Sequence, residues 1–76
     1  MTKAEKQYQR FRDLITEARR SAGLTQVEVA ARLKQNQSYV SKYESGVRRL
    51  DVVEYIQVAK AVGIDPAELI RKLAGG

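Results

Sequence analysis

Apolar residues recur at steps of three and four positions along most of the chain, and no stretch alternates strictly between apolar and polar residues. This spacing is typical of amphipathic α-helices. The first apolar stripe consists of Tyr8, Phe11, Leu14, Ile15, Ala18 and Ala22. It predicts a helix from about Lys3 to Ala22, which Gly23 would end.

Capping residues predict two short helices in the centre of the chain. Thr25 and Glu28 have the spacing of a capping box, which would start a helix over residues 26–33. Asn36 is a good N-cap for a second helix over residues 37–45. The apolar residues expected to face inward are Val29, Ala30, Leu33, Val40 and Tyr43. Only a turn fits between the two helices, so residues 26–45 are predicted to form a helix-turn-helix motif.

Two further helices are expected in the last third of the chain. Asp51 would cap a helix that ends before Gly63. The positions of this helix expected to face inward are Val52, Tyr55, Ile56, Ala59 and Val62. Asp65 followed by Pro66 is a strong signal for the start of a last helix over about residues 66–74. Gly75 and Gly76 are expected to fray. The fold class is therefore all-α, a compact bundle of about five short helices forming one domain over residues 1–76.

Composition excludes several classes of function. The 76 residues include no Cys and no His, so disulfides, zinc–thiolate sites and the common nucleophile–base pairs are all absent. We expect no enzyme activity, no metal and no cofactor. No apolar run approaches the roughly 18 residues of a membrane span, and the first residues lack the apolar stretch of a signal peptide. A cytoplasmic protein without membrane contact is expected.

The positive charge is concentrated in the middle of the chain. The net charge is +5 at pH 7. Residues 19–49 contain seven basic and two acidic residues, a net +5, whereas residues 1–18 carry +1 and residues 50–76 carry −1. The middle segment, which contains the helix-turn-helix and the residues flanking it, thus holds the whole excess, and this favours a polyanionic partner.

The central residues resemble a known family. The run Leu24-Thr25-Gln26, followed by Ala30, Leu33 and the segment from Gln37 to Gly46, looks like the phage repressor/Cro-type (XRE) helix-turn-helix family. Residues 51–70 are similar to that family's fourth and fifth helices, and the resemblance covers about residues 12–73. It implies a lambda-repressor-like DNA-binding domain. The function it implies is a sequence-specific transcriptional regulator that binds double-stranded DNA, with its second motif helix in the major groove.

The resemblance also implies roles for single residues. The base-reading residues would be Gln37, Ser38, Tyr39, Ser41 and Lys42. The phosphate or minor-groove contacts would come from Gln26, Lys34, Arg48 and Arg49. Arg19 and Glu44 match a partly buried salt bridge that would position the recognition helix. Tyr39 is equally compatible with base contact, phosphate contact or packing, and Arg48 and Arg49 could instead be a solvated loop.

Two residues depart from the family at the turn, and one of them is Gln35, which replaces a usual small apolar residue. Lys34 occupies a position where the family often has Gly. If the backbone there has a positive φ, a Lys costs about 1 kcal/mol relative to Gly, which a phosphate contact could offset.

A homodimer is expected because one helix-turn-helix buries too little surface for tight specific binding. The candidate dimer surface consists of Val53, Ile64, Ile70 and Leu73, with the last helix as the dimerisation element. A core too small to bury every apolar side chain would explain the exposure of the same residues equally well. The alternative function is a protein-interaction module of the same fold, whose partner would be a second protein such as a toxin or a polymerase subunit.

Overall fold

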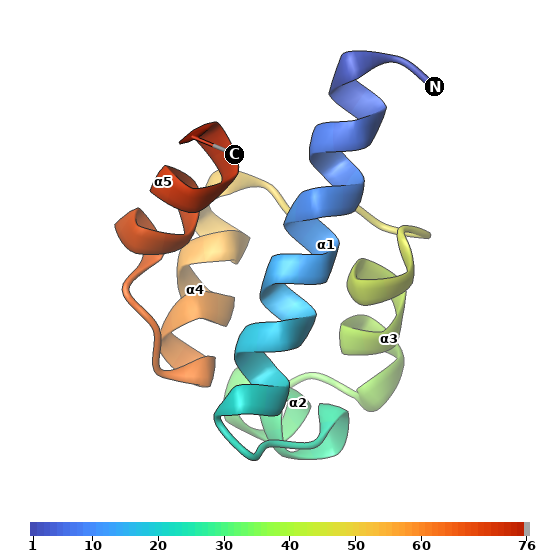
Figure 1. The fold of residues 1–76 in the computed structure, drawn as a ribbon. Helices are drawn as coiled ribbons and strands as arrows, with labels where there is room; N and C mark the ends of the chain where they lie inside the picture. The colour runs from blue at the N-terminus through green and yellow to red at the C-terminus, as the bar shows by residue number, and fades with distance from the viewer. Residues whose placement is uncertain (76) are drawn as a thin grey trace.

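Five α-helices joined by short turns make up residues 1–75, the part of the chain that the computed structural model describes (Figure 1). The helices are α1 (Lys3–Ser21), α2 (Gln26–Leu33), α3 (Gln37–Ser45), α4 (Val52–Val62) and α5 (Pro66–Gly75). The all-α fold class is confirmed. Gly75 was expected to fray, but it is the last residue of α5. Gly76 lies outside the described residues.

Side-chain caps determine where most of the helices begin. Thr2, Thr25 and Asp51 each accept a hydrogen bond from the backbone N–H three residues later, and the Glu at that position bonds back to the capping residue. Each reciprocal pair satisfies two N–H groups that would otherwise lack partners. Asn36 caps α3 with its side chain alone. Local chemistry therefore sets the predicted starts of α2, α3 and α4.

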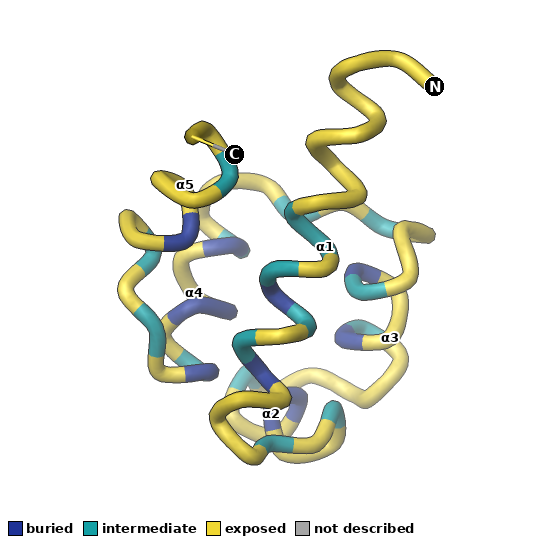
Figure 2. The backbone as a smooth tube through the Cα atoms, in the orientation of Figure 1, coloured by how far each residue is buried: buried dark blue, intermediate teal, exposed yellow. Residues whose placement is uncertain are grey.

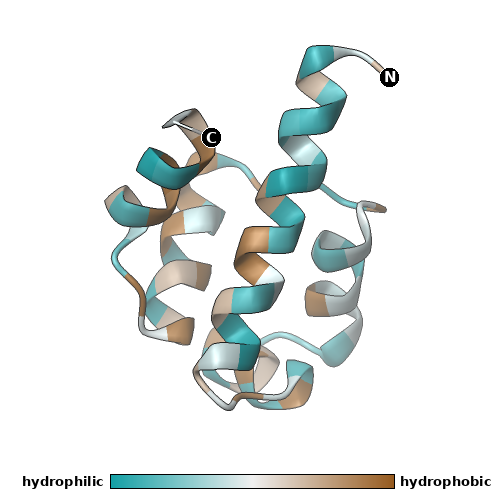
Figure 3. Cartoon of the chain, in the orientation of Figure 1, coloured by the Kyte–Doolittle hydropathy of each residue, from teal (hydrophilic) through white to brown (hydrophobic). Residues whose placement is uncertain are grey.

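α1 crosses the middle of the molecule and separates α3 on one side from α4 and α5 on the other, with α2 beneath it (Figure 1). Its first turns extend beyond the other helices and are mostly hydrophilic and exposed (Figures 2 and 3). Tyr8 and Ala22 stand at the two ends of the predicted stripe and are both exposed, because the core is shorter than α1. None of the described helices is long and apolar enough to cross a membrane.

The core lies between α1, α2 and the inner faces of α3, α4 and α5. Its fully buried side chains of largest volume are Ile15, Val29, Val40, Tyr43 and Val58. Val58 was not among the residues expected to face inward on α4, whereas Val52 and Ile56, which were, are exposed. Tyr55, Ala59 and Val62 are buried as expected. They share one face with Val52 and Ile56 in the predicted arrangement and with Val58 in the observed one. Periodicity alone therefore did not decide which flank of α4 faces the core.

Candidate nucleic-acid interface

α2 and α3 form the helix-turn-helix, and the backbone of the turn is left-handed at Lys34. This residue has φ 57° and ψ 39°, and among the described residues it is the one non-glycine position with positive φ. Its N–H donates to the Ala31 carbonyl, and the next N–H, of Gln35, donates to the Ala30 carbonyl at 2.9 Å. The last carbonyl groups of α2 thus have hydrogen-bond partners, as in a helix that ends at a glycine. Here, however, a residue with a side chain adopts the strained left-handed backbone conformation.

α3 has one buried face and one exposed polar face. Val40 and Tyr43 are at most 2% exposed and attach the helix to the core. The exposed polar side chains are Gln37, Ser38, Ser41, Lys42 and Ser45. The Ser38 hydroxyl donates to the Asn36 cap, so this side chain is already oriented. Four of the five residues expected to read bases therefore share one accessible face.

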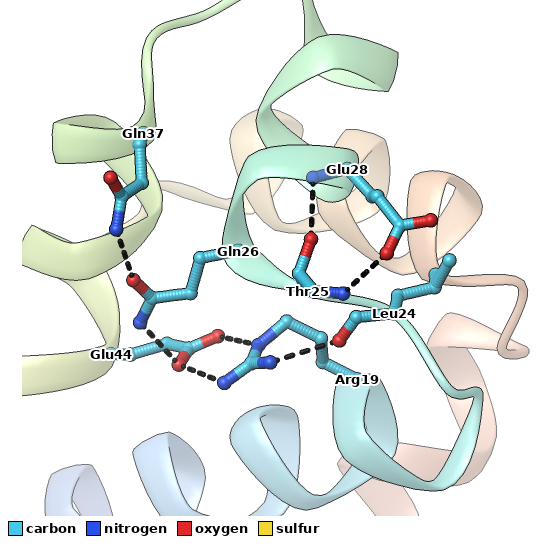
Figure 4. Close-up of polar contacts among 7 residues, drawn as sticks. All are labelled: Arg19, Leu24, Thr25, Gln26, Glu28, Gln37 and Glu44. Atoms are coloured by element: carbon cyan, nitrogen blue, oxygen red, sulfur yellow. Dashed lines mark hydrogen bonds and ion pairs between the residues drawn. The ribbon is translucent and has the colours of Figure 1, made fainter.

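Arg19 and Glu44 form a nearly buried, bidentate ion pair between α1 and α3 (Figure 4). Arg19 Nε lies 2.7 Å from Glu44 Oε2, and the two side chains are 10% and 7% exposed. The remaining Arg19 nitrogen donates to the Leu24 carbonyl at 2.9 Å. The hydrogen bond with Glu44 raises the pKa of Arg19, against the effect of burial. The pair fixes α3 against the end of α1.

Two glutamines extend this ion pair to the exposed face of α3. Gln26 Nε2 donates to Glu44 Oε1 at 3.1 Å, and Gln37 Nε2 donates to Gln26 Oε1 at 3.1 Å (Figure 4). From the sequence, Gln26 and Gln37 were expected to make separate DNA contacts, and the hydrogen bond between them was not predicted. Each glutamine is the first residue of its helix in the motif, and this shared position is the sequence signal that could have predicted their contact.

Arg48 is held by two partners within the protein. Its guanidinium pairs with Glu54 and lies 4.8 Å from the centre of the Tyr39 ring. Arg48 lowers the pKa of Glu54 through their hydrogen bond. Tyr39 is half-buried and packs edge-on against Tyr43, with ring centres 5.7 Å apart. Of the three roles considered for Tyr39, the structure shows the packing. The alternative considered for Arg48 was a side chain surrounded only by solvent, and its contacts with Glu54 and Tyr39 differ from that alternative.

The other cations expected at DNA are more accessible. Lys34, Lys42 and Arg49 are exposed, and none of them forms an ion pair within residues 1–75. The Arg49 guanidinium lies 3.8 Å from the centre of the Tyr8 ring, which gives it an apolar support while its charge faces solvent. Arg49 was predicted as a DNA contact, and its stacking on Tyr8 was not.

The four residues of the candidate dimer surface do not line one common groove. Ile64 lines a groove between the end of α1 and the α4–α5 turn. Ile70 and Leu73 line a different groove, with Tyr8 and Val52 on its other wall. Val53 is 65% exposed and lines neither groove. Helical periodicity placed Val53, Ile70 and Leu73 on their helices, but it did not predict how α5 lies across α1 and α4.

Comparisons with known proteins give the same motif. A family model described as "Helix-turn-helix" matches residues 15–69. The chain belongs to the XRE-type helix-turn-helix family. It is similar to an HTH-type transcriptional regulator, y4dJ, of Sinorhizobium fredii, with 42% identity over 52 residues that cover 68% of each chain.

A solved structure extends the similarity of this XRE-type chain to nearly its full length. An XRE-family like protein from Pseudomonas syringae pv. tomato matches with a TM-score of 0.92 and 47% identity, over 95% of this chain and 88% of the other. At the level of the family, the chain is a DNA-binding transcriptional regulator.

Proposed function

We propose that the chain is a sequence-specific regulator that places α3 in the major groove of double-stranded DNA. The observation that carries this proposal is the division of α3 into a buried apolar face and an exposed polar face. Gln37, Ser38, Ser41 and Lys42 offer the amide, hydroxyl and ammonium groups that recognise base edges. The regulator would act in the cytoplasm, on bacterial or phage DNA.

Phosphate contacts would hold this helix in place. Gln26 and Lys34 flank one end of α3, and Arg49 follows its other end. Exposed cations at both ends of a recognition helix can grip phosphates on the two sides of the groove. Arg48 would contribute mainly by supporting Tyr39, since Glu54 already neutralises its charge.

We further propose that two copies bind a near-palindromic operator. Two recognition helices about 34 Å apart would reach successive major grooves on one side of the duplex. α5 is the proposed dimerisation element, through Ile70 and Leu73 in the groove that Tyr8 and Val52 also line.

In-vitro selection of random duplexes at physiological salt tests this proposal, because nonspecific phosphate binding is weak under those conditions. Wild type should enrich an inverted repeat, and Gln37→Ala should lose one base preference in each half-site. Gln57→Ala is the matched control, because Gln57 is exposed on α4 outside the motif. Binding that is the same for every sequence and only declines with salt would contradict sequence reading. Recovery of a stoichiometric protein partner, with no DNA affinity, would favour the protein-interaction module.

A further inference from the structure

The first half of α1 lies outside the region that the family model matches, and it contacts the loop that follows α3. The match covers residues 15–69, and Tyr8 precedes it. The loop between α3 and α4 crosses behind α1 in Figure 1. At this crossing, the Arg49 guanidinium lies 3.8 Å from the centre of the Tyr8 ring. A residue outside the matched motif therefore supports a cation at the end of the recognition helix.

The small hollow at this crossing is lined by positive charge. Its charged lining residues are Arg12, Arg48 and Arg49, and none of the described acidic residues lines it. Arg12 approaches Gly46, the C-cap of α3, and Arg48 pairs with Glu54. Arg49 is exposed and forms no ion pair within residues 1–75. Its charge therefore remains available, next to two other arginines, to attract an anion.

Arg48 and Arg49 are neighbours in the sequence, but their partners differ in kind. Glu54 neutralises Arg48, and it also accepts from the Asp51 N–H at 3.0 Å, which holds the carboxylate at the start of α4. The Tyr8 ring is uncharged, so it attracts the Arg49 guanidinium without neutralising it. The face of a ring also leaves the N–H groups at the edge of a guanidinium free to donate to phosphate oxygens. Arg49 is therefore held in place and keeps its charge, whereas the charge of Arg48 is neutralised.

We propose that Tyr8 positions Arg49 for contact with a DNA phosphate, so that the first half of α1 belongs to the DNA interface, while Glu54 keeps Arg48 from making a second such contact. Tyr8 is a positioning residue, and Arg49 makes the contact. The inference rests on the proposed function, which places the end of α3 beside the DNA backbone. A free arginine side chain loses much rotamer freedom when it grips a phosphate. The stack on Tyr8 has already removed part of that freedom, so less is lost on binding.

Tyr8→Leu is the first test, because it removes the ring and keeps an apolar side chain in the groove. The probe is a mixed-sequence duplex, whose binding depends mainly on phosphate contacts. The affinity at fixed salt should fall about threefold, the effect of losing an exposed cation–π contact. The conservative variant Tyr8→Phe keeps the ring and should restore the affinity. A loss in Tyr8→Phe as large as that in Tyr8→Leu would mean that the hydroxyl acts directly, and it would overturn the proposal.

A double-mutant cycle shows whether Tyr8 acts through Arg49. Arg49→Ala should weaken binding and lower the slope of log affinity against log salt by about one. In this background, Tyr8→Leu should change the affinity little, because the ring has no guanidinium left to position. Additive losses would overturn the proposal. All affinities are measured below the melting temperatures of the variants, so a less stable fold does not imitate the effect.

Arg48 supplies the matched comparison, because it is the neighbouring arginine of the same loop. Arg48→Ala should lower the salt slope by less than Arg49→Ala does. In Glu54→Gln, the amide oxygen can still accept from the Asp51 N–H, but the negative charge is gone. The salt slope should then rise by about one, and adding Arg48→Ala should remove the increase. An unchanged slope in Glu54→Gln would contradict the role given to Glu54.

Proton NMR of the DNA-free protein separates this proposal from the proposed function. The ring current of Tyr8 should shift the δ protons of Arg49 upfield in wild type and in Tyr8→Phe. In Tyr8→Leu, these resonances should move toward those of the exposed Arg71. Identical Arg49 resonances in wild type and Tyr8→Leu would overturn the stack whatever the binding data show.

The binding data also distinguish the two proposals. A protein that binds every duplex equally would contradict sequence reading, yet a non-additive cycle between Tyr8 and Arg49 would still support the phosphate contact. A protein that shows the stack by NMR but binds no duplex would refute the proposed function and the phosphate contact together.

Discussion

The guanidinium of Arg12 lies against Gly46, with its Cζ 3.0 Å from the point that a Cβ on this glycine would occupy. Gly46 is the C-cap of α3 and has φ +90°. Arg12 thus brings a positive charge from α1 to the C-terminal end of the recognition helix, where carbonyl groups point outward and the helix dipole favours a cation. The contact requires a residue that has no side chain and tolerates a left-handed backbone.

Gly46→Ala should therefore be more destabilising than Gly63→Ala. Both glycines are C-caps with φ +90°, so the backbone strain of an alanine, about 1 kcal/mol, is common to both variants. A Cβ at Gly63 would meet no atom within 4 Å, whereas one at Gly46 would displace Arg12. Thermal denaturation of the two variants measures the difference. Equal losses would mean that Arg12 moves aside at no cost.

Glu44→Ala should lower the free energy of unfolding by about 3–5 kcal/mol, because it leaves the Arg19 guanidinium buried without its partner. Glu68→Ala is the control, since its pair with Lys72 is exposed and 3.9 Å long. Such a surface pair contributes about 0–1 kcal/mol. Chemical denaturation of the two variants gives the comparison, and an unchanged midpoint for Glu44→Ala would show that the ion pair does not hold α3.

Lys34→Gly should stabilise the fold by about 1 kcal/mol, because it relieves the left-handed strain at φ 57°. The same change should weaken DNA binding and lower the slope of log affinity against log salt by about one, if Lys34 contacts a phosphate. Lys34→Ala removes the charge but keeps the Cβ, so it should share the loss of binding without the gain in stability. A Lys34→Gly protein with unchanged salt dependence would exclude the phosphate contact.

Acidification should destabilise the protein partly through Glu54. Its hydrogen bond with Arg48 holds the folded-state pKa below the ordinary value of 4.5. The resulting stabilisation is complete above pH 4.5 and is lost as the pH falls through the lower, folded-state pKa. In Glu54→Gln, which keeps a capping-box side chain, the melting temperature should fall less between pH 7 and pH 3. Part of the loss should remain, since the Thr25 backbone also lowers the pKa of Glu28. Identical pH profiles for wild type and Glu54→Gln would contradict this role.

The helix boundaries were predictable because their signals are local. Thr25, Asn36 and Asp51 act on backbone groups within three residues, and the structure begins α2, α3 and α4 directly after them. The inward flank of α4 was not predictable, because it depends on where α1, α2 and α5 lie around that helix. For this reason Val58 was missed and Val52 was misplaced.

The site was predictable at the level of single residues but not of their connections. The resemblance indicated which positions would lie on α3, and the exposed face carries Gln37, Ser38, Ser41 and Lys42. The pairing of Arg48 with Glu54 joins the loop after α3 to α4, and the stacking of Arg49 on Tyr8 joins it to α1. Such contacts depend on side-chain conformations and on the angles between helices, which sequence periodicity does not contain.

The three capping boxes also bear on how the chain folds. Each box closes over three residues, so α1, α2 and α4 can begin to form before distant parts of the chain meet. Chains whose contacts are mainly local fold within microseconds to milliseconds, since little loop-closure entropy must be lost first. The single proline, at the first position of α5, is in a trans peptide bond, the form that most unfolded chains already hold. Most molecules should therefore refold in one fast phase, and newly made protein would be competent soon after synthesis.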